Sequence, residues 1–222
     1  MARIGVILSG CGVLDGSEIQ EAVLMLLSLS QRGAEYQCMA PDRPATAINH
    51  LTKKPEPEQR NVLAESARIA RGEIIRLADV KGDEYDGFLL PGGFGAAKTL
   101  CTFAAKGAEC DVDPDVARVL TEAHKARKPL GFACIAPTIA ARVFGQESPK
   151  LTIGHDAATA GGLEALGAKH VTCDVKDIVA DETLQIVTTP AYMEAKSLSD
   201  LHLGIDKLVA QVLEWAEVPE YA

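Results

Sequence analysis

The sequence lacks the marks of several protein classes. Its 6 cysteines include no Cys-x-x-Cys pair and none of the regular spacings of a zinc site or a dense disulfide framework. We therefore expect free thiols in a reducing, cytoplasmic compartment. The apolar run near the N-terminus, Ile4 to Leu8, is far too short to span a bilayer. We expect no signal peptide, membrane segment or lipid anchor.

Positive charge is also scarce. The chain has 22 Lys and Arg against 31 Asp and Glu, a formal net charge of −9. This balance argues against a partner that presents dense negative charge, so we expect no nucleic acid and no membrane surface among its partners. Small molecules or other proteins are the expected partners. With 222 residues, of which 47% are hydrophobic, the chain can bury its own core, and we expect a single domain over residues 1–222.

Short apolar or β-branched runs alternate with longer segments of helical period, which is typical of a mainly parallel sheet covered on both faces. The expected strands are Ile4–Leu8, Tyr36–Ala40, Glu73–Leu77, Gly87–Leu90, Pro129–Ala133, Leu151–Gly154, His170–Cys173, Ile178–Ala180 and Gln185–Thr188. The last two are expected to form an appended hairpin. The expected helices are Ser17–Gln31, Ala117–Lys125, Pro137–Val143, Ala157–Leu166 and an apolar stripe from Leu198 to Leu213. The stretch Asp42–Arg60 is expected to be an exposed loop.

Two glycine-rich segments bear a superficial likeness to nucleotide-binding loops. Ser9–Gly16 has the spacing G-x-G-x-x-x-G rather than that of the dinucleotide fingerprint, although Asp42 stands where a ribose ligand is expected. The charges of Asp15 and Glu18 oppose an anion at this helix start, so a simple turn is the better interpretation. Pro91–Thr99 resembles a phosphate-binding loop but has Ala97 where that motif needs glycine.

The same second segment suits a different use. Gly92 and Gly93 follow an apolar strand and can turn a peptide N–H toward a ligand, as an oxyanion hole requires. A plain Pro-Gly turn is an equally good interpretation of this segment taken alone.

Cys134 stands where an apolar strand gives way to a helix, with Pro137 suited to the first helical turn. This order predicts a nucleophile elbow that exposes the sulfur above the sheet, with the N–H of Ile135 as an oxyanion donor. The helix N-terminus is expected to favour the thiolate over the thiol. Most free cysteines are inert and buried, but Cys134 alone lies where a parallel sheet builds its active site.

An acidic partner for this sulfur is expected from the first helix. Glu18 and Glu21 are three residues apart and share a face, so either could reach Cys134. Burial and the thiolate would raise the pKa of such an acid and let it shuttle a proton near neutral pH. For Glu18, a role in starting the helix is the better interpretation. His155 ends an expected strand and could also enter the site, whereas Ile135 excludes a Cys-His dipeptide.

Taken together, these segments resemble a known family. Ile4–Gly12, Asp15–Ile19, Pro91–Lys98, the Cys134 elbow, Leu151–Gly154 and Val187–Met193 occur in the order found in the bacterial ElbB glyoxalases, also called isoprenoid-biosynthesis or sigma-cross-reacting proteins. The resemblance runs from about Arg3 to Leu213. This family belongs to the class I glutamine-amidotransferase-like superfamily.

The resemblance implies a flavodoxin-like three-layer sandwich formed by one amidotransferase-like domain, with no metal and no organic cofactor. It implies Cys134 as nucleophile and Glu21 as its acidic partner, with Glu18 as the fallback. Gly92, Gly93 and Ile135 are the candidate oxyanion and substrate-binding positions. Relatives of this kind are commonly dimers, so a homodimer is expected. Because Ile135 stands where hydrolytic members have histidine, peptidase or glutaminase activity is not expected.

The implied activity is a glutathione-independent, glyoxalase III-type lyase that detoxifies methylglyoxal. In this scheme Cys134 forms a hemithioacetal with a 2-oxoaldehyde, and the acid isomerises it to a thioester that water cleaves to a 2-hydroxy acid. An alternative is a non-catalytic stress protein in which Cys134 senses oxidants or electrophiles. Nucleotide binding at either glycine-rich segment is a third and weaker hypothesis.

Overall fold

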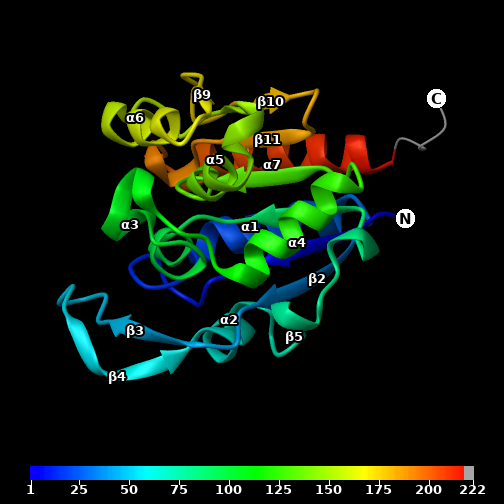
Figure 1. Cartoon of the computed structure of the whole chain (residues 1–222). Coiled ribbons are helices and arrows are strands. Elements are labelled where there is room, and N and C mark those ends of the chain that lie inside the picture. The colour runs from blue at the N-terminus through cyan, green and yellow to red at the C-terminus, as the bar shows by residue number, and fades with distance from the viewer. Residues whose placement is uncertain (218–222) are drawn as a thin grey trace.

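A seven-stranded sheet forms the centre of the molecule (Figure 1). The computed structural model describes residues 1–217. The strand order is β10-β11-β7-β6-β1-β2-β5, and every neighbouring pair is parallel except β10 with β11. The strands are β1 (Arg3–Ile7), β2 (Glu35–Ala40), β5 (Ile74–Arg76), β6 (Gly87–Leu90), β7 (Leu130–Ala133), β10 (Val179–Asp181) and β11 (Ile186–Thr189). This confirms the mainly parallel sheet with an appended hairpin.

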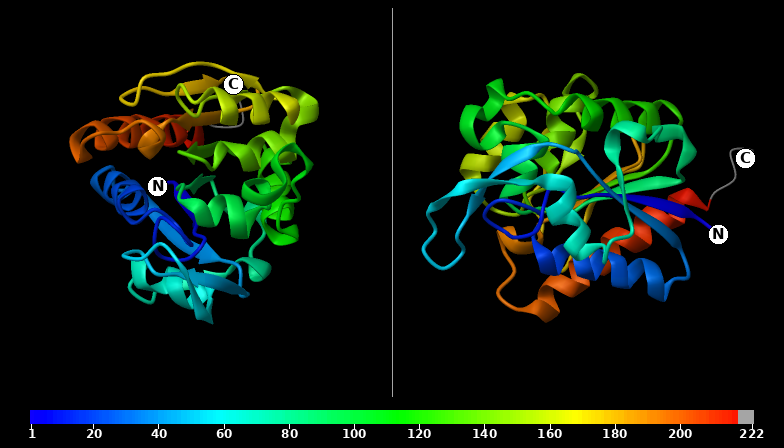
Figure 2. Two further views of the ribbon diagram at one scale, coloured as in Figure 1. Left: turned by 90° about the vertical axis from the view of Figure 1, so that its left-hand side faces the viewer. Right: turned by 90° about the horizontal axis from the view of Figure 1, so that it is seen from below.

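The central strands are short apolar runs because both of their faces are covered. All residues of β6, β7 and β11 are buried. Helices lie on both sides of the sheet, and the end-on view in Figure 2 (left) shows the three layers. The helices are α1 (Ile19–Gln31), α2 (Val62–Ile69), α3 (Phe103–Lys106), α4 (Pro114–Lys125), α5 (Pro137–Phe144), α6 (Ala157–Ala165) and α7 (Leu198–Ala216).

Two hydrophobic cores hold these layers together. On one side, α1 and α7 pack against the sheet through residues such as Met25, Leu29 and Leu208. On the other side, α4 and α5 contribute Val119, Ile139 and their neighbours. Because each helix buries only one stripe of apolar side chains, the helical periodicity in the sequence identified α1, α4, α5 and α7 within a few residues of their ends.

The expectation of a loop over Asp42–Arg60 is wrong. This segment forms an antiparallel hairpin of β3 (Pro44–Ile48) and β4 (Pro55–Asn61), which projects from the body of the molecule in Figure 1. β4 is polar and mostly exposed, and β3 is a five-residue strand of mainly small residues that begins with Pro44. Neither strand has the pronounced apolar alternation that signals a half-buried strand. Helix α2, which is capped by Asn61, was not predicted either.

Two further expected strands, Leu151–Gly154 and His170–Cys173, are replaced by two-residue strands that each begin one residue earlier. Only Lys150–Leu151 (β8) and Lys169–His170 (β9) pair, and they form a separate two-stranded parallel sheet. After β8 the chain passes through Gly154, whose φ is +89°. It then enters α6, which begins beside the site described next.

Candidate active site

Cys134 occupies a strained turn between β7 and α5, as the elbow hypothesis requires. Its φ is +59°, a left-handed conformation that is uncommon for a residue with a side chain. The Cys134 amide donates to the carbonyl oxygen of Thr189 at 3.0 Å, which anchors the elbow to the neighbouring strand β11. Such strain persists only where the surroundings hold it, and it is concentrated at functional sites.

The Glu21 side chain from α1 meets this sulfur inside the protein. Glu21 is fully buried, and both of its carboxyl oxygens accept backbone hydrogen bonds. Gly92 donates to Oε2 at 2.7 Å and Tyr192 donates to Oε1 at 3.1 Å. The carboxyl lies beside the Cys134 thiol, and the two groups are close enough to influence each other's pKa. The structure therefore brings Cys134 and Glu21 together, in the pairing that the resemblance implies.

The surroundings raise the pKa of both groups. Burial raises the pKa of Glu21 from 4.5 to about 7, and the nearby Glu18 charge adds to this rise. Burial and the Glu21 charge also raise the pKa of the Cys134 thiol well above its usual value. The backbone N–H groups of Gly93 and Ile135 act in the opposite direction but do not outweigh these effects.

The expected preference for the thiolate is therefore wrong for the resting site. The start of α5 supplies N–H groups, as predicted, but the depth of burial and the adjacent carboxyl dominate. With its pKa near neutrality, the Glu21 carboxyl is able to accept a proton from the neighbouring thiol.

Gly92 and Gly93 are glycines for a steric reason. A Cβ on Gly92 would lie 2.8 Å from Cys134 Sγ and 2.9 Å from Glu21 Oε2. A Cβ on Gly93 would lie 2.4 Å from the amide nitrogen of Glu18, and the φ of Gly93 is +89°. The loop after β6 thus lies directly against the thiol and the carboxyl because it has no side chains there.

Glu18 has the structural role that the sequence favoured for it. Its carboxylate caps α1 by accepting from the Glu21 amide at 2.7 Å. Its own amide donates to the Gly92 carbonyl oxygen at 2.9 Å. Glu18 therefore fixes the first turn of α1 and the glycine loop relative to each other, and it influences the pKa of Glu21 through its charge.

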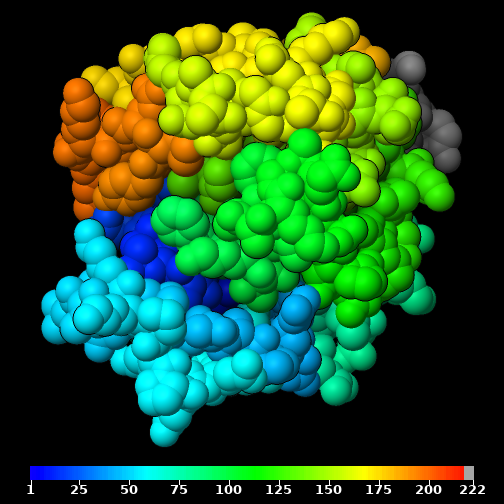
Figure 3. Space-filling model, turned by 60° about the vertical axis from the view of Figure 1, so that its left-hand side comes forward, coloured from blue at the N-terminus to red at the C-terminus, as the bar shows by residue number. Residues whose placement is uncertain are grey.

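A pocket of about 380 Å³ opens onto Cys134, which is 8% exposed. Its lining residues are Val13, Gly93, Phe94, Cys134, Ile135, Asp156, Thr159, Tyr192 and Met193. In Figure 3 the surface is hollowed where the blue N-terminal, green central and orange C-terminal segments meet. A small molecule bound in this pocket would therefore lie against Cys134.

Several residues of the pocket were not among the expected site residues. Tyr192 contributes its amide to Glu21 and its side chain to the pocket, while Asp156 and Thr159 come from the start of α6. The segment containing Tyr192 supported the family resemblance, yet its role depends on a contact 171 residues away in the chain. That contact has no local signal in the sequence.

Other sequence candidates do not join the site. His155 does not line the pocket; its side chain is exposed and its Nδ1 is hydrogen bonded to Glu194. In the first glycine-rich loop, Gly10 donates its amide to Ser66 Oγ at 2.9 Å and Gly12 donates to the Ser17 carbonyl oxygen at 2.9 Å. These amides already have protein partners, which disfavours a phosphate cradle.

Comparisons with known proteins identify the family. The chain is 47% identical to the mitochondrial ES1 protein homolog of Rattus norvegicus over 96% of its length and 84% of that protein. It is also 47% identical to the human mitochondrial glutamine amidotransferase-like class 1 domain-containing protein 3, over 96% of this chain and 83% of that protein. The chain belongs to the ES1 family. No family model matches the sequence.

Solved structures place the ES1 fold in the wider amidotransferase-like superfamily. An isoprenoid biosynthesis protein with an amidotransferase-like domain from Ehrlichia chaffeensis is 32% identical and superposes with a TM-score of 0.89, covering 96% of this chain and 99% of that one. A Schizosaccharomyces pombe DJ-1 variant is 18% identical with a TM-score of 0.56, covering 98% and 100%. The latter likeness supports the flavodoxin-like fold alone.

These relatives support the superfamily rather than the narrower resemblance to bacterial ElbB glyoxalases. The rat and human ES1 proteins are named as mitochondrial, so they give no support to the expected cytoplasmic location. Within residues 1–217, no helix is long and apolar enough to cross a membrane.

Proposed function

We propose that this ES1 protein is a glutathione-independent glyoxalase that converts 2-oxoaldehydes such as methylglyoxal to 2-hydroxy acids. The observation that carries the proposal is the direct pairing of a strained, pocket-lining cysteine with a buried glutamate whose pKa is near neutrality. A nucleophile and a proton acceptor in contact are the two groups that this isomerisation requires.

The first step forms a bond between Cys134 Sγ and the aldehyde carbon. Glu21 takes the thiol proton as sulfur attacks, and the electron pair of the C=O double bond moves to oxygen. The amides of Gly93 and Ile135, which already face the sulfur, are placed to stabilise this oxyanion. Protonation of the oxygen by Glu21 gives a neutral hemithioacetal and returns the carboxylate.

The second step moves a proton between adjacent carbons. Glu21 removes the hydrogen of the former aldehyde carbon as a proton, which leaves an enediolate. Glu21 returns this proton to the neighbouring carbon, and the hydroxyl proton of the first carbon moves to the oxygen of the second. The product is a thioester of a 2-hydroxy acid on Cys134. Water then cleaves the carbon–sulfur bond, releases the hydroxy acid and restores the thiol. The net reaction adds one water molecule to the oxoaldehyde, and this scheme needs no metal, organic cofactor or added thiol.

The test is product analysis with methylglyoxal in the absence of added thiol. The wild-type chain is expected to form lactate over many turnovers, whereas Cys134→Ser is expected to form none while keeping its circular dichroism spectrum. Cys11→Ser is the matched control, because Cys11 is a partly exposed thiol outside this pocket. Lactate production by Cys134→Ser at the wild-type rate would exclude the covalent scheme.

The sensor alternative uses the same cysteine but requires a thiol with a low pKa. A thiol that reacts spontaneously with oxidants needs a low pKa, whereas burial and Glu21 raise the pKa of Cys134. This favours the enzyme, in which substrate binding is coupled to proton transfer. Stoichiometric modification of Cys134 by methylglyoxal without lactate release would favour the sensor instead.

A further inference from the structure

The pocket at Cys134 is larger than methylglyoxal requires. A volume of about 380 Å³ has room for roughly a dozen water-sized groups. Methylglyoxal carries only a methyl group beyond its two carbonyl carbons and would leave most of this space unfilled. Pockets in this size range generally hold a ligand with a body of several carbon atoms.

The walls of the pocket are mainly apolar. The apolar side chains that line it belong to Val13, Phe94, Ile135 and Met193. Phe94 is 46% exposed, which is unusual for a phenyl ring and leaves part of its surface available to a ligand. Covering such surface favours binding of an apolar group by the hydrophobic effect.

One charged side chain lines the pocket, and it is negative. Asp156 caps α6 by accepting from the Thr159 amide at 2.8 Å, and these bonds lower its pKa. The carboxylate is therefore ionised at neutral pH. The start of α6 carries a partial positive charge, but Asp156 already occupies that position and supplies a full negative charge.

A cation next to Phe94 lines a neighbouring pocket instead. Lys98 Nζ lies 4.8 Å from the centroid of the Phe94 ring and donates to the Leu14 carbonyl oxygen at 3.1 Å. It lines a second cavity of about 350 Å³ together with Arg43, not the cavity that contains Cys134. Glu18 and Glu21 are not among the residues that line the pocket, and they carry no positive charge.

We propose that this pocket selects aldehydes with an uncharged apolar body larger than a methyl group, and that Asp156 acts as a specificity residue that disfavours substrates carrying a carboxylate. The aldehyde in this statement rests on the proposed function. The size and charge preference of the pocket rests on its walls alone, and it can be measured without turnover.

The experiment compares alkylating reagents that share one reactive carbon. Iodoacetamide is neutral, iodoacetate is anionic and N-benzyl iodoacetamide carries an apolar ring. The rate at Cys134 is followed by mass spectrometry of its peptide and divided by the rate with N-acetylcysteine amide, a neutral free thiol. Because each reagent attacks the same sulfur, the fraction of thiolate cancels from the ratios.

The wild-type chain is expected to disfavour iodoacetate against iodoacetamide by about tenfold beyond the free thiol. N-benzyl iodoacetamide is expected to exceed iodoacetamide by about tenfold on the same scale. Asp156→Asn keeps the helix cap, since asparagine caps as well as aspartate, and is expected to reduce the discrimination against iodoacetate by about threefold. Asp83→Asn is the control for a unit change in net charge at an exposed site.

Three results would overturn the proposal. If iodoacetate reacts as fast as iodoacetamide or faster, relative to the free thiol, the charge preference is contradicted. If Lys98→Gln then removes this fast reaction of iodoacetate, the specificity is assigned to Lys98. If the ratio of the iodoacetate rate to the iodoacetamide rate is the same in Asp156→Asn and Asp83→Asn, Asp156 has no role in the specificity. No gain from the benzyl group would contradict the apolar preference. Failure of the glyoxalase proposal is recognised separately, by absence of lactate from methylglyoxal while these alkylation ratios hold.

Discussion

The Gly92 amide donates a 2.7 Å hydrogen bond to Glu21 Oε2. This bond ties the loop after β6 to the helix after β1, two segments that are far apart in the sequence. The same carboxyl accepts from Tyr192, so three parts of the chain converge on one buried acid next to Cys134. These bonds hold the acid in a fixed position, and burial raises its pKa.

Substitution of Glu21 should separate its role from that of Glu18. We expect Glu21→Gln to lower kcat with methylglyoxal by about 10²-fold or more, because the amide cannot accept the proton. Glu18→Gln should keep kcat within about threefold and lower the free energy of unfolding by about 1 kcal/mol, because it weakens the α1 cap. Steady-state kinetics and urea titration measure the two effects. The opposite pattern would make Glu18 the catalytic acid and base.

The rate should depend on pH through the same carboxyl. Since Glu21 acts first as a base and its pKa is raised to about 7, kcat/KM is expected to rise with pH and level off above that value. Glu18→Gln should move the midpoint downward, because the Glu18 charge contributes to the rise in the Glu21 pKa. A midpoint near 4.5, the usual value for glutamate, would mean that the carboxyl is solvated during catalysis.

Stability should respond to pH in the opposite direction. Glu21 has a higher pKa in the folded state than in the unfolded state, so its favourable contribution is complete below about pH 4.5 and is lost as the pH rises through about 7. The shift corresponds to roughly 3 kcal/mol. The free energy of unfolding of Glu21→Gln, relative to wild type, should therefore increase by that order between about pH 5 and pH 8. Equal pH profiles for both proteins would contradict a buried, ionisable Glu21.

The local parts of the site could be predicted from the sequence, and the long-range parts could not. Cys134, Ile135 and Gly93 follow apolar strands directly, and the ends of parallel strands meet at one edge of a sheet. Glu18 and Glu21 share a helix face, so residue spacing alone could not decide which one turns inward. The backbone contact of Tyr192 depends on how distant segments pack.

The electrostatics and the β3–β4 hairpin were missed for separate reasons. The sequence reveals a helix N-terminus next to Cys134 but not how deeply the thiol is buried, and burial determines the direction of its pKa shift. In the hairpin, over residues 44–61, β4 is polar and β3 is short and made mainly of small residues, so no clear hydrophobic periodicity marked it.

Gly92→Ala tests whether the glycine loop must contact the thiol and the carboxyl. The added methyl group would lie 2.4 Å from Cys134 Cβ, so either the loop or the elbow must move. We expect kcat to fall by about 10²-fold, since small displacements of catalytic groups are costly. Gly161→Ala in α6 is the matched control, because its Cβ meets no atom within 4 Å. It should retain activity and gain up to about 1 kcal/mol of stability. Full activity of Gly92→Ala would show that the loop contact is dispensable.

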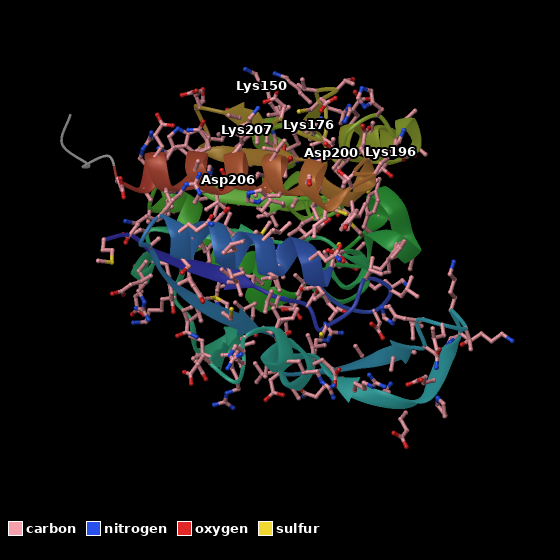
Figure 4. All side chains as sticks on the ribbon, turned by 180° about the vertical axis from the view of Figure 1, so that it is seen from behind. Lys150, Lys176, Lys196, Asp200, Asp206 and Lys207 are labelled. Atoms are coloured by element: carbon pink, nitrogen blue, oxygen red, sulfur yellow. The ribbon has the colours of Figure 1, made fainter. Side chains whose placement is uncertain are left out.

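The position of α1, and therefore of Glu21, should depend on a pairing with α7. Arg32 just after α1 makes a two-pronged contact with Asp206, at 2.6 and 2.9 Å, and Ser28 Oγ also donates to Asp206 at 2.7 Å. Figure 4 shows Asp206 on α7 facing α1, and Lys207 beside it on the same helix.

Both ends of the Arg32–Asp206 pair are about a third exposed, so we expect Asp206→Asn to lower the free energy of unfolding by only about 1 kcal/mol. Asp177→Asn, which breaks the more exposed pair with Lys207, should change it by less than about 0.5 kcal/mol. Urea titrations at neutral pH measure both, and equal losses from the two substitutions would show that the Arg32–Asp206 pair does not fix the packing of α1 on α7.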